Sequence, residues 1–105
     1  MENLHFQRPA HTGVKRRALV GYVGSGDLEV MIEPCTTAQA DIHILTSSPS
    51  SETRWRQVLE RIEAVQPFPA MRMDIHDFAA TPGVIRLRIE QALELALQDQ
   101  EVSHG

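Results

Sequence analysis

Apolar and polar residues alternate along four separate stretches of the chain, which predicts four β-strands. The strands are expected at residues 17–23, 28–33, 41–45 and 71–76. Alternation with a period of two is typical of a strand that buries one face, so Ile42 and Ile44 should point into a core. The pattern therefore predicts a sheet with one covered face.

Two other stretches place apolar residues at helical spacing, one on each side of the fourth expected strand. We expect Ser48 to cap the first helix with Pro49 as its first residue, and Pro67 to end it. Thr81 and Pro82 should begin the second helix in the same way. The expected buried stripes are Trp55, Val58, Leu59, Ile62 and Val65 in the first helix and Ile85, Ile89, Ala92, Leu93 and Ala96 in the second.

The element order β-β-β-α-β-α predicts an α+β fold in a single domain of 105 residues. A two-layer α/β sandwich, with a four-stranded mixed sheet and both helices on one face, would bury every apolar surface. The helix between the third and fourth strands would make that pair parallel, and the other pairs should be antiparallel. We expect residues 1–14 to be a leader, partly ordered through Leu4 and Phe6, and residues 99–105 to be a frayed tail.

Composition excludes several classes of protein. The net charge of −4 leaves no dominant basic field for nucleic acid. No apolar run is as long as a membrane span, and no signal-peptide pattern opens the sequence, so we expect no membrane partner. The single cysteine, Cys35, excludes an internal disulfide and fits the reducing cytoplasm. We expect this thiol to have no chemical role.

Carboxylates and imidazoles occur two residues apart on two of the expected strands. Asp41 with His43, and Asp74 with His76, would share a face and could converge on a transition metal if the strands were neighbours. Asp77 follows the second pair. The alternative is that these residues are the polar positions of half-buried strands. Because no sequence-local ligand motif supports a metal site, we expect none.

The turn between the first two strands places Ser25 between Gly24 and Gly26, followed by Asp27. One interpretation is a β-hairpin and nothing more, because glycine and aspartate suit tight turns. The other is a covalent attachment site, since no neighbouring side chain blocks the serine hydroxyl. A serine hydrolase is not indicated, because Val23 stands where its nucleophile motif needs glycine.

Several segments together resemble one known family. They are residues 17–21, the turn at residues 23–30, the Asp-Ile-His-Asp-Phe run at residues 74–78, and residues 80–84 and 86–88. These segments resemble the acyl carrier (delta) subunit family of bacterial malonate decarboxylase over nearly the whole chain. The citrate lyase carrier subunit is a more distant resemblance, which shares mainly the Ser-Gly-Asp tip.

The resemblance implies that Ser25 carries 2′-(5″-phosphoribosyl)-3′-dephospho-CoA through a phosphodiester. The terminal thiol of that arm would hold acetyl and malonyl groups as thioesters. Gly24 and Gly26 would leave room for the ribose phosphate, and their N–H groups would contact its oxygens. Asp27 would repel the phosphodiester if it pointed there, so we expect its carboxylate to turn back onto the hairpin backbone.

The resemblance also implies partners and a role without catalysis. The chain would work with a transferase subunit, the decarboxylase subunits, a malonyl transferase, and a prosthetic-group transferase (a holo-carrier synthase). It would not be an enzyme by itself. Two alternatives remain open: a citrate lyase-type carrier, and a small regulatory module that binds a free anion at the glycine turn. The resemblance assigns no role to Asp74, His76 and Asp77, which we expect to serve the fold or an interface.

Overall fold

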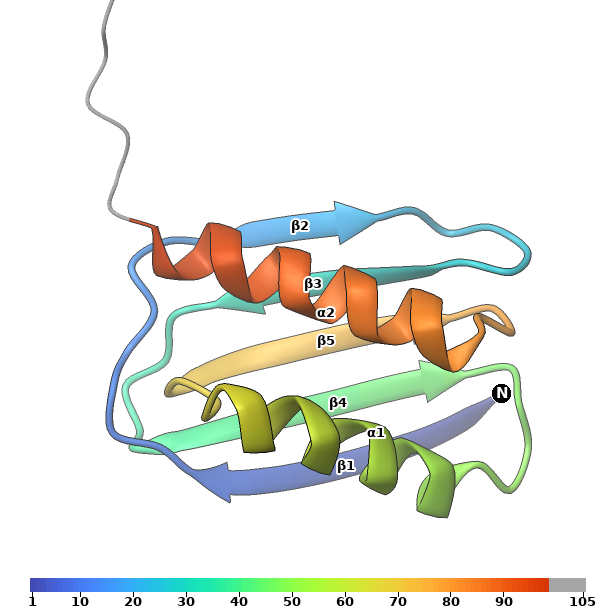
Figure 1. The fold of residues 1–105 in the computed structure, drawn as a ribbon, viewed down its shortest axis with the longest axis horizontal. Helices are drawn as coiled ribbons and strands as arrows, with labels where there is room; N and C mark the ends of the chain where they lie inside the picture. Colours follow the sequence, from blue (N-terminus) through green and yellow to red (C-terminus); the bar gives the residue numbers. More distant parts are fainter. Residues whose placement is uncertain (99–105) are drawn as a thin grey trace, which may run out of the picture.

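Five strands and two helices make up residues 1–98, the part of the chain that the computed structural model describes (Figure 1). The elements are β1 (Glu2–Pro9), β2 (Ala18–Gly21), β3 (Leu28–Glu33), β4 (Gln39–Thr46), α1 (Glu52–Val65), β5 (Met71–Asp77) and α2 (Pro82–Leu97). The strand order across the sheet is β1-β4-β5-β3-β2. The expected tail, residues 99–105, lies outside the described residues.

The sheet is mixed, as predicted. β4 and β5 run parallel, with α1 between them in the chain, while β1 with β4, β2 with β3, and β3 with β5 are antiparallel. Both helices lie over the same face of the sheet (Figure 1). The prediction of a two-layer sandwich with its helices on one side is therefore confirmed.

The predicted number of four strands is wrong, because the expected leader contains a strand. β1 pairs with β4 along its full length, from Glu2 opposite Thr46 to Pro9 opposite Gln39. Leu4 and Phe6 are 7% and 5% exposed and belong to the core. Two apolar positions gave a weak strand signal, and the pairing partner lies too far along the chain for a local pattern to reveal it.

The start of the first helix also differs from the prediction. α1 begins at Glu52 with Ser51 as its N-cap, and Ser48 and Pro49 lie in the preceding turn. The Ser51 hydroxyl donates a hydrogen bond of 2.9 Å to the carbonyl oxygen of Ser48, which fastens this turn to the helix. At the other end Val65 is 71% exposed, so the buried stripe stops one turn earlier than expected.

The second helix begins as predicted. Thr81 is its N-cap, and the Thr81 hydroxyl accepts a hydrogen bond of 3.3 Å from the Val84 N–H. Pro82 is the first helical residue, where its missing N–H is harmless. The helix therefore leaves the β5 end of the sheet at a fixed point.

The core lies between the two helices and the covered face of the sheet. Trp55 is 1% exposed, as expected for a core residue. Side chains with no exposed area include Leu28, Val30, Ile32, Ile42, Met71, Met73, Ile89 and Leu93. Alternate residues of the three inner strands thus supply one continuous apolar layer.

The other face of the sheet has no helix over it within residues 1–98 (Figure 1). One row of paired residues across this uncovered face comprises His5, His43, Asp74, Met31 and Leu19. The row changes from polar at β1 to apolar at β2. No helix in residues 1–98 is both long and apolar enough to cross a membrane.

The Phe6→Ala variant tests whether β1 is part of the stable fold. Phe6 is buried under the helix layer, and the Arg56 guanidinium lies over its ring at 5.5 Å from the centroid. Removal of the ring should lower the free energy of unfolding by about 3 kcal/mol, measured by urea denaturation. The control is Gln7→Ala, which removes an exposed side chain from the same strand. Equal stability of the two variants would show that β1 is detached in solution.

Candidate functional site

Residues 22–27, here called the serine loop, join β2 to β3 at one end of the sheet (Figure 1). The predicted hairpin is confirmed, although its first strand ends at Gly21 instead of Val23. Gly21 has a φ of 81°, and a Cβ there would lie 2.0 Å from the carbonyl oxygen of Leu28. The hairpin therefore requires glycine at the point where the chain leaves the sheet.

Ser25 lies exposed in this loop, between the two glycines that the sequence places there. Gly26 has a φ of 78°, and nothing lies within 4 Å of the position of an added Cβ. The Tyr22 ring lies beside Gly24, where an added Cβ would approach it to 2.6 Å. The Gly26 side of the serine is thus open to solvent, whereas the Tyr22 ring lies on the Gly24 side.

Asp27, unlike Ser25, is buried, with 8% of its surface exposed. Its Oδ1 accepts a hydrogen bond of 2.7 Å from the Leu28 N–H. The Arg88 guanidinium of α2 donates to both carboxylate oxygens, through Nε at 3.1 Å and Nη2 at 3.0 Å. The prediction that this carboxylate turns back to the hairpin backbone is confirmed. The sequence did not predict its second partner, Arg88.

Those hydrogen bonds also set the protonation state of the aspartate. The Arg88 hydrogen bonds, followed by the one from Leu28, hold the pKa of Asp27 below its ordinary value of 3.8, against the opposing effect of burial. Asp27 is therefore ionised at neutral pH, and its charge is compensated by a guanidinium. The pair connects the serine loop to the second turn of α2, which Thr81 positions from its start.

Backbone hydrogen bonds fasten the loop to the chain that follows β5. The Gly26 N–H donates to the Phe78 carbonyl oxygen at 2.7 Å, and the Phe78 N–H donates to the Asp27 carbonyl oxygen at 3.0 Å. A third bond, from the Asp27 N–H to the Gly24 carbonyl oxygen at 3.1 Å, closes the turn around Ser25. The Gly26 N–H is therefore committed to Phe78, and the expectation that it contacts a phosphate is wrong.

Asp77 serves the fold, as expected for part of the Asp-Ile-His-Asp-Phe run. It is 2% exposed, and its Oδ2 accepts a hydrogen bond of 2.7 Å from the Thr46 hydroxyl. Its Oδ1 accepts another of 3.0 Å from the Ala80 N–H. Asp77 thus joins the ends of β4 and β5 to the turn that leads into α2, and Phe78 continues that turn to the serine loop.

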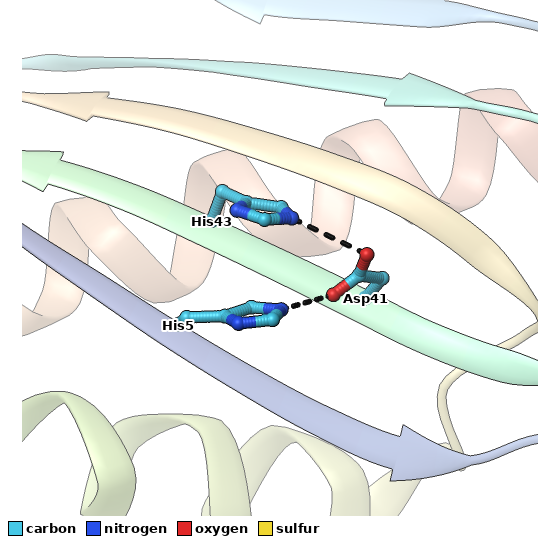
Figure 2. A group of neighbouring side chains, drawn as sticks. All are labelled: His5, Asp41 and His43. Atoms are coloured by element: carbon cyan, nitrogen blue, oxygen red, sulfur yellow. Dashed lines mark hydrogen bonds and ion pairs between the residues drawn. The ribbon is translucent and has the colours of Figure 1, made fainter.

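The four candidate metal ligands lie on neighbouring strands, but they do not converge. His43 of β4 is paired with Asp74 of β5, and the Asp74 carboxylate binds the Arg72 guanidinium at 3.0 and 3.1 Å. The Asp41 carboxylate instead lies between the Nε2 atoms of His43 and of His5 from β1 (Figure 2). A hydrogen bond from His5 is the main cause that lowers the pKa of Asp41.

Nothing near Ser25 in residues 1–98 forms a catalytic triad. No histidine hydrogen-bonds to the Ser25 hydroxyl in this part of the chain, and Asp27 is occupied by Arg88 and Leu28. A nucleophilic serine needs an adjacent base, so this arrangement does not activate the hydroxyl. The Ser25 hydroxyl is instead exposed at the surface.

Comparisons with known proteins agree with one another. The family model for the malonate decarboxylase delta subunit (MdcD) matches residues 15–96. The malonate decarboxylase acyl carrier protein of Azotobacter vinelandii is 53% identical over 94 residues, which are 90% of this chain and 95% of the relative. That of Pseudomonas putida is 50% identical over 99 residues, 94% of this chain and all of the relative.

One similar solved structure is a crystal structure of a Pseudomonas malonate decarboxylase hetero-tetramer in complex with malonate. The matching chain is 50% identical, with a TM-score of 0.87. The match covers 91% of this chain and 99% of that chain. The described fold is therefore close to that of a chain in that complex.

We expect Asp27→Asn to destabilise the protein in a pH-dependent way. The folded pKa is depressed, so the stabilisation is complete above pH 3.8 and is lost as the pH falls through the lower folded value. At pH 7 the variant should be less stable by about 2 kcal/mol, the scale for charge-assisted hydrogen bonds. Urea unfolding at pH 7 and at successive lower pH values should show this gap closing.

The matched control is Glu90→Gln, which breaks the exposed pair between Arg86 and Glu90 on the same helix. Exposed pairs contribute about 0.5 kcal/mol, so this variant should remain close to the wild type at every pH. If both variants lost the same stability, the Asp27–Arg88 pair would have no special role in anchoring the loop.

Gly21→Ala should destabilise the hairpin by about 2 kcal/mol or more, because the methyl group meets the Leu28 carbonyl and the positive φ is strained. Gly13→Ala is the control, since its Cβ would have nothing within 4 Å and its φ is not positive. Thermal unfolding of the two variants tests the difference. A Gly21→Ala protein that melts with the Gly13→Ala protein would contradict the described turn.

Proposed function

Because the chain belongs to the malonate decarboxylase delta subunit family, we propose that Ser25 is the attachment point of its prosthetic group. The protein is an acyl carrier subunit of malonate decarboxylase and is not itself an enzyme. The observation that carries the proposal is the exposed hydroxyl of Ser25. Hydrogen bonds of Asp27 and Phe78 hold the loop that contains it. A modifying enzyme can reach such a hydroxyl in one defined orientation.

The proposed group is 2′-(5″-phosphoribosyl)-3′-dephospho-CoA, bound to the serine through a phosphodiester. The surroundings of Ser25 fit a large substituent, because the Gly26 side is open. Among residues 1–98, no acceptor takes the N–H groups of Gly24 and Ser25, so these remain available to a phosphate oxygen. When bound, the arm supplies a terminal thiol that carries acetyl or malonyl as a thioester.

Asp27 keeps the serine compatible with a phosphodiester. An unpaired carboxylate two residues away would repel the phosphate oxygens and would itself be costly to bury. The bidentate contact with Arg88 compensates that charge and directs both carboxylate oxygens toward Leu28 and α2. The loop therefore presents a hydroxyl and two N–H groups to the prosthetic group, while its one acidic side chain is neutralised.

The carrier has other subunits as partners, in line with the hetero-tetramer of the similar Pseudomonas enzyme. We propose that these are a transferase subunit and the decarboxylase subunits, with a malonyl transferase and a prosthetic-group transferase (holo-carrier synthase) acting on the arm. A tether of this length keeps the acyl group at an effective concentration on the order of millimolar at each site. The unpaired thiol of Cys35 suits the cytoplasm, where we place the complex.

The two alternatives have less support. The similar relatives are carriers of malonate decarboxylase, which disfavours a citrate lyase carrier. A module that binds a free anion would have the N–H groups of Gly24 and Ser25 but not that of Gly26, which donates to the Phe78 carbonyl, and the similar relatives are named as carriers.

Ser25→Ala should abolish modification of the carrier. Wild-type protein isolated from a host that expresses the whole malonate decarboxylase system should have the added mass of the phosphoribosyl-dephospho-CoA group in intact-mass spectra. The Ser25→Ala protein should have the mass of the bare chain, and the complex that contains it should have no malonate decarboxylase activity. Ser47→Ala, which alters another exposed serine, is the control and should remain modified. An unmodified wild type, or modified Ser25→Ala protein, would refute the attachment site.

A further inference from the structure

We propose that His5, Asp41 and His43 form a binding site for a divalent transition metal on the uncovered face of the sheet. We call these three residues the histidine cluster. His5 and His43 are directly opposite each other in the β1–β4 pairing, and Asp41 lies two residues before His43 on the same face. Two imidazoles and one carboxylate on adjacent strands form a set of metal ligands that sheet geometry holds together.

The cluster has its ligand atoms directed at one small region (Figure 2). The two imidazole rings are stacked, with centroids 4.2 Å apart and planes 14° from parallel. Both Nε2 atoms face the Asp41 carboxylate, His5 against Oδ1 and His43 against Oδ2 at 3.3 Å. One ligand atom from each residue lies within 4.8 Å of the other two.

His43 supplies the observation that points to a ligand. Its Nε2 is buried, and its contact within residues 1–98 is the 3.3 Å ion pair with Asp41, which does not fully satisfy it as a hydrogen bond. Buried polar atoms without a partner are rare, since the lost hydration is not replaced. A metal ion between this nitrogen and the Asp41 carboxylate would satisfy both groups.

Local charge permits a cation. Arg72 and Asp74 face the cluster from β5, but the guanidinium is bound in two places by the Asp74 carboxylate. The Asp74 carboxylate therefore offsets most of the positive charge of Arg72, although Arg72 also interacts electrostatically with Asp41. Asp41 supplies the negative charge of the histidine cluster, which attracts a divalent ion.

The ligand chemistry selects the class of metal. Nitrogen from two histidines and oxygen from one aspartate suit Zn²⁺, Ni²⁺ or Co²⁺, whereas Ca²⁺ and Mg²⁺ prefer oxygen alone. Bonds of about 2.1 Å in tetrahedral geometry place ligand atoms roughly 3.4 Å apart. The 3.3 Å between His43 Nε2 and Asp41 Oδ2 already matches this spacing, whereas His5 Nε2 must move away from the Asp41 carboxylate to admit an ion. The side chain of His5, which is 49% exposed, is free enough to make that movement.

The histidine cluster favours a metal site, which the sequence alone did not predict. The sequence suggested Asp41 and His43 together with Asp74 and His76, and that set does not assemble. The ligand that completes the site is His5, which came from the segment expected to be a leader. The site is independent of Ser25, so the proposal goes beyond the carrier function and does not rest on it.

Isothermal titration of the tag-free, full-length chain with ZnCl₂ and, separately, NiCl₂ tests the proposal. The wild type should bind one ion per chain. His43→Ala should bind at least about tenfold more weakly, and so should His5→Gln, a milder change on an exposed edge-strand side chain. Circular dichroism of each variant verifies that it is folded. Ser25→Ala should bind like the wild type, which separates this result from any failure of the carrier proposal.

The controls remove other possible ligands. His11→Ala alters an exposed histidine outside the cluster, and Cys35→Ser removes the thiol. Both should bind the metal as the wild type does. The proposal is overturned if the wild type binds neither ion, if the folded His5→Gln protein retains wild-type affinity, or if Cys35→Ser or His11→Ala removes the binding.

Discussion

The ion pair between Asp27 and Arg88 is the interaction on which the serine loop depends. β2 is a four-residue strand at the edge of the sheet, so it offers little pairing to hold the loop that follows it. Loops at sheet edges are normally mobile because few contacts restrain them. Here a buried carboxylate within the loop is bound by a guanidinium from the helix layer. If the loop left α2, the charge-assisted hydrogen bonds between Asp27 and Arg88 would be lost, at a cost of about 2 kcal/mol.

Most of the fold follows from local pattern. The strands around Ile42, Met73 and Val30 alternate clearly because the helices cover one face only, and the Thr81 cap has an unambiguous sequence signature. β1 was missed because strand formation there depends on pairing with β4, which no local pattern encodes. The start of α1 was misplaced because several serines precede it, and propensity alone does not decide which of them becomes the cap.

The site was only partly predictable, for a similar reason. The turn chemistry around Ser25 predicts an exposed hydroxyl, and the resemblance predicts its role. Arg88 was part of the segments that carry the resemblance, but its contact with Asp27 spans 61 positions and is set by how α2 packs on the hairpin. An isolated glycine turn leaves the Gly26 N–H free for an anion, whereas in the fold the chain after β5 accepts its hydrogen bond. Tertiary contacts thus decide which groups of the loop remain available.

The serine loop combines two requirements that usually conflict. A hydroxyl that accepts a large substituent must be reachable, whereas the substituent must leave from a fixed point if partner subunits are to find it. The described hydrogen bonds that hold the loop join Asp27 to α2, join Gly26 and Asp27 to Phe78, and close the turn itself through Gly24 and Leu28. None of them uses the serine hydroxyl within residues 1–98, so the proposed modification would leave them intact. A helix start would provide free N–H groups and a favourable dipole for a phosphate. The hairpin has fewer free N–H groups, but the pairing of Asp27 with Arg88 keeps its own carboxylate from opposing the proposed phosphodiester.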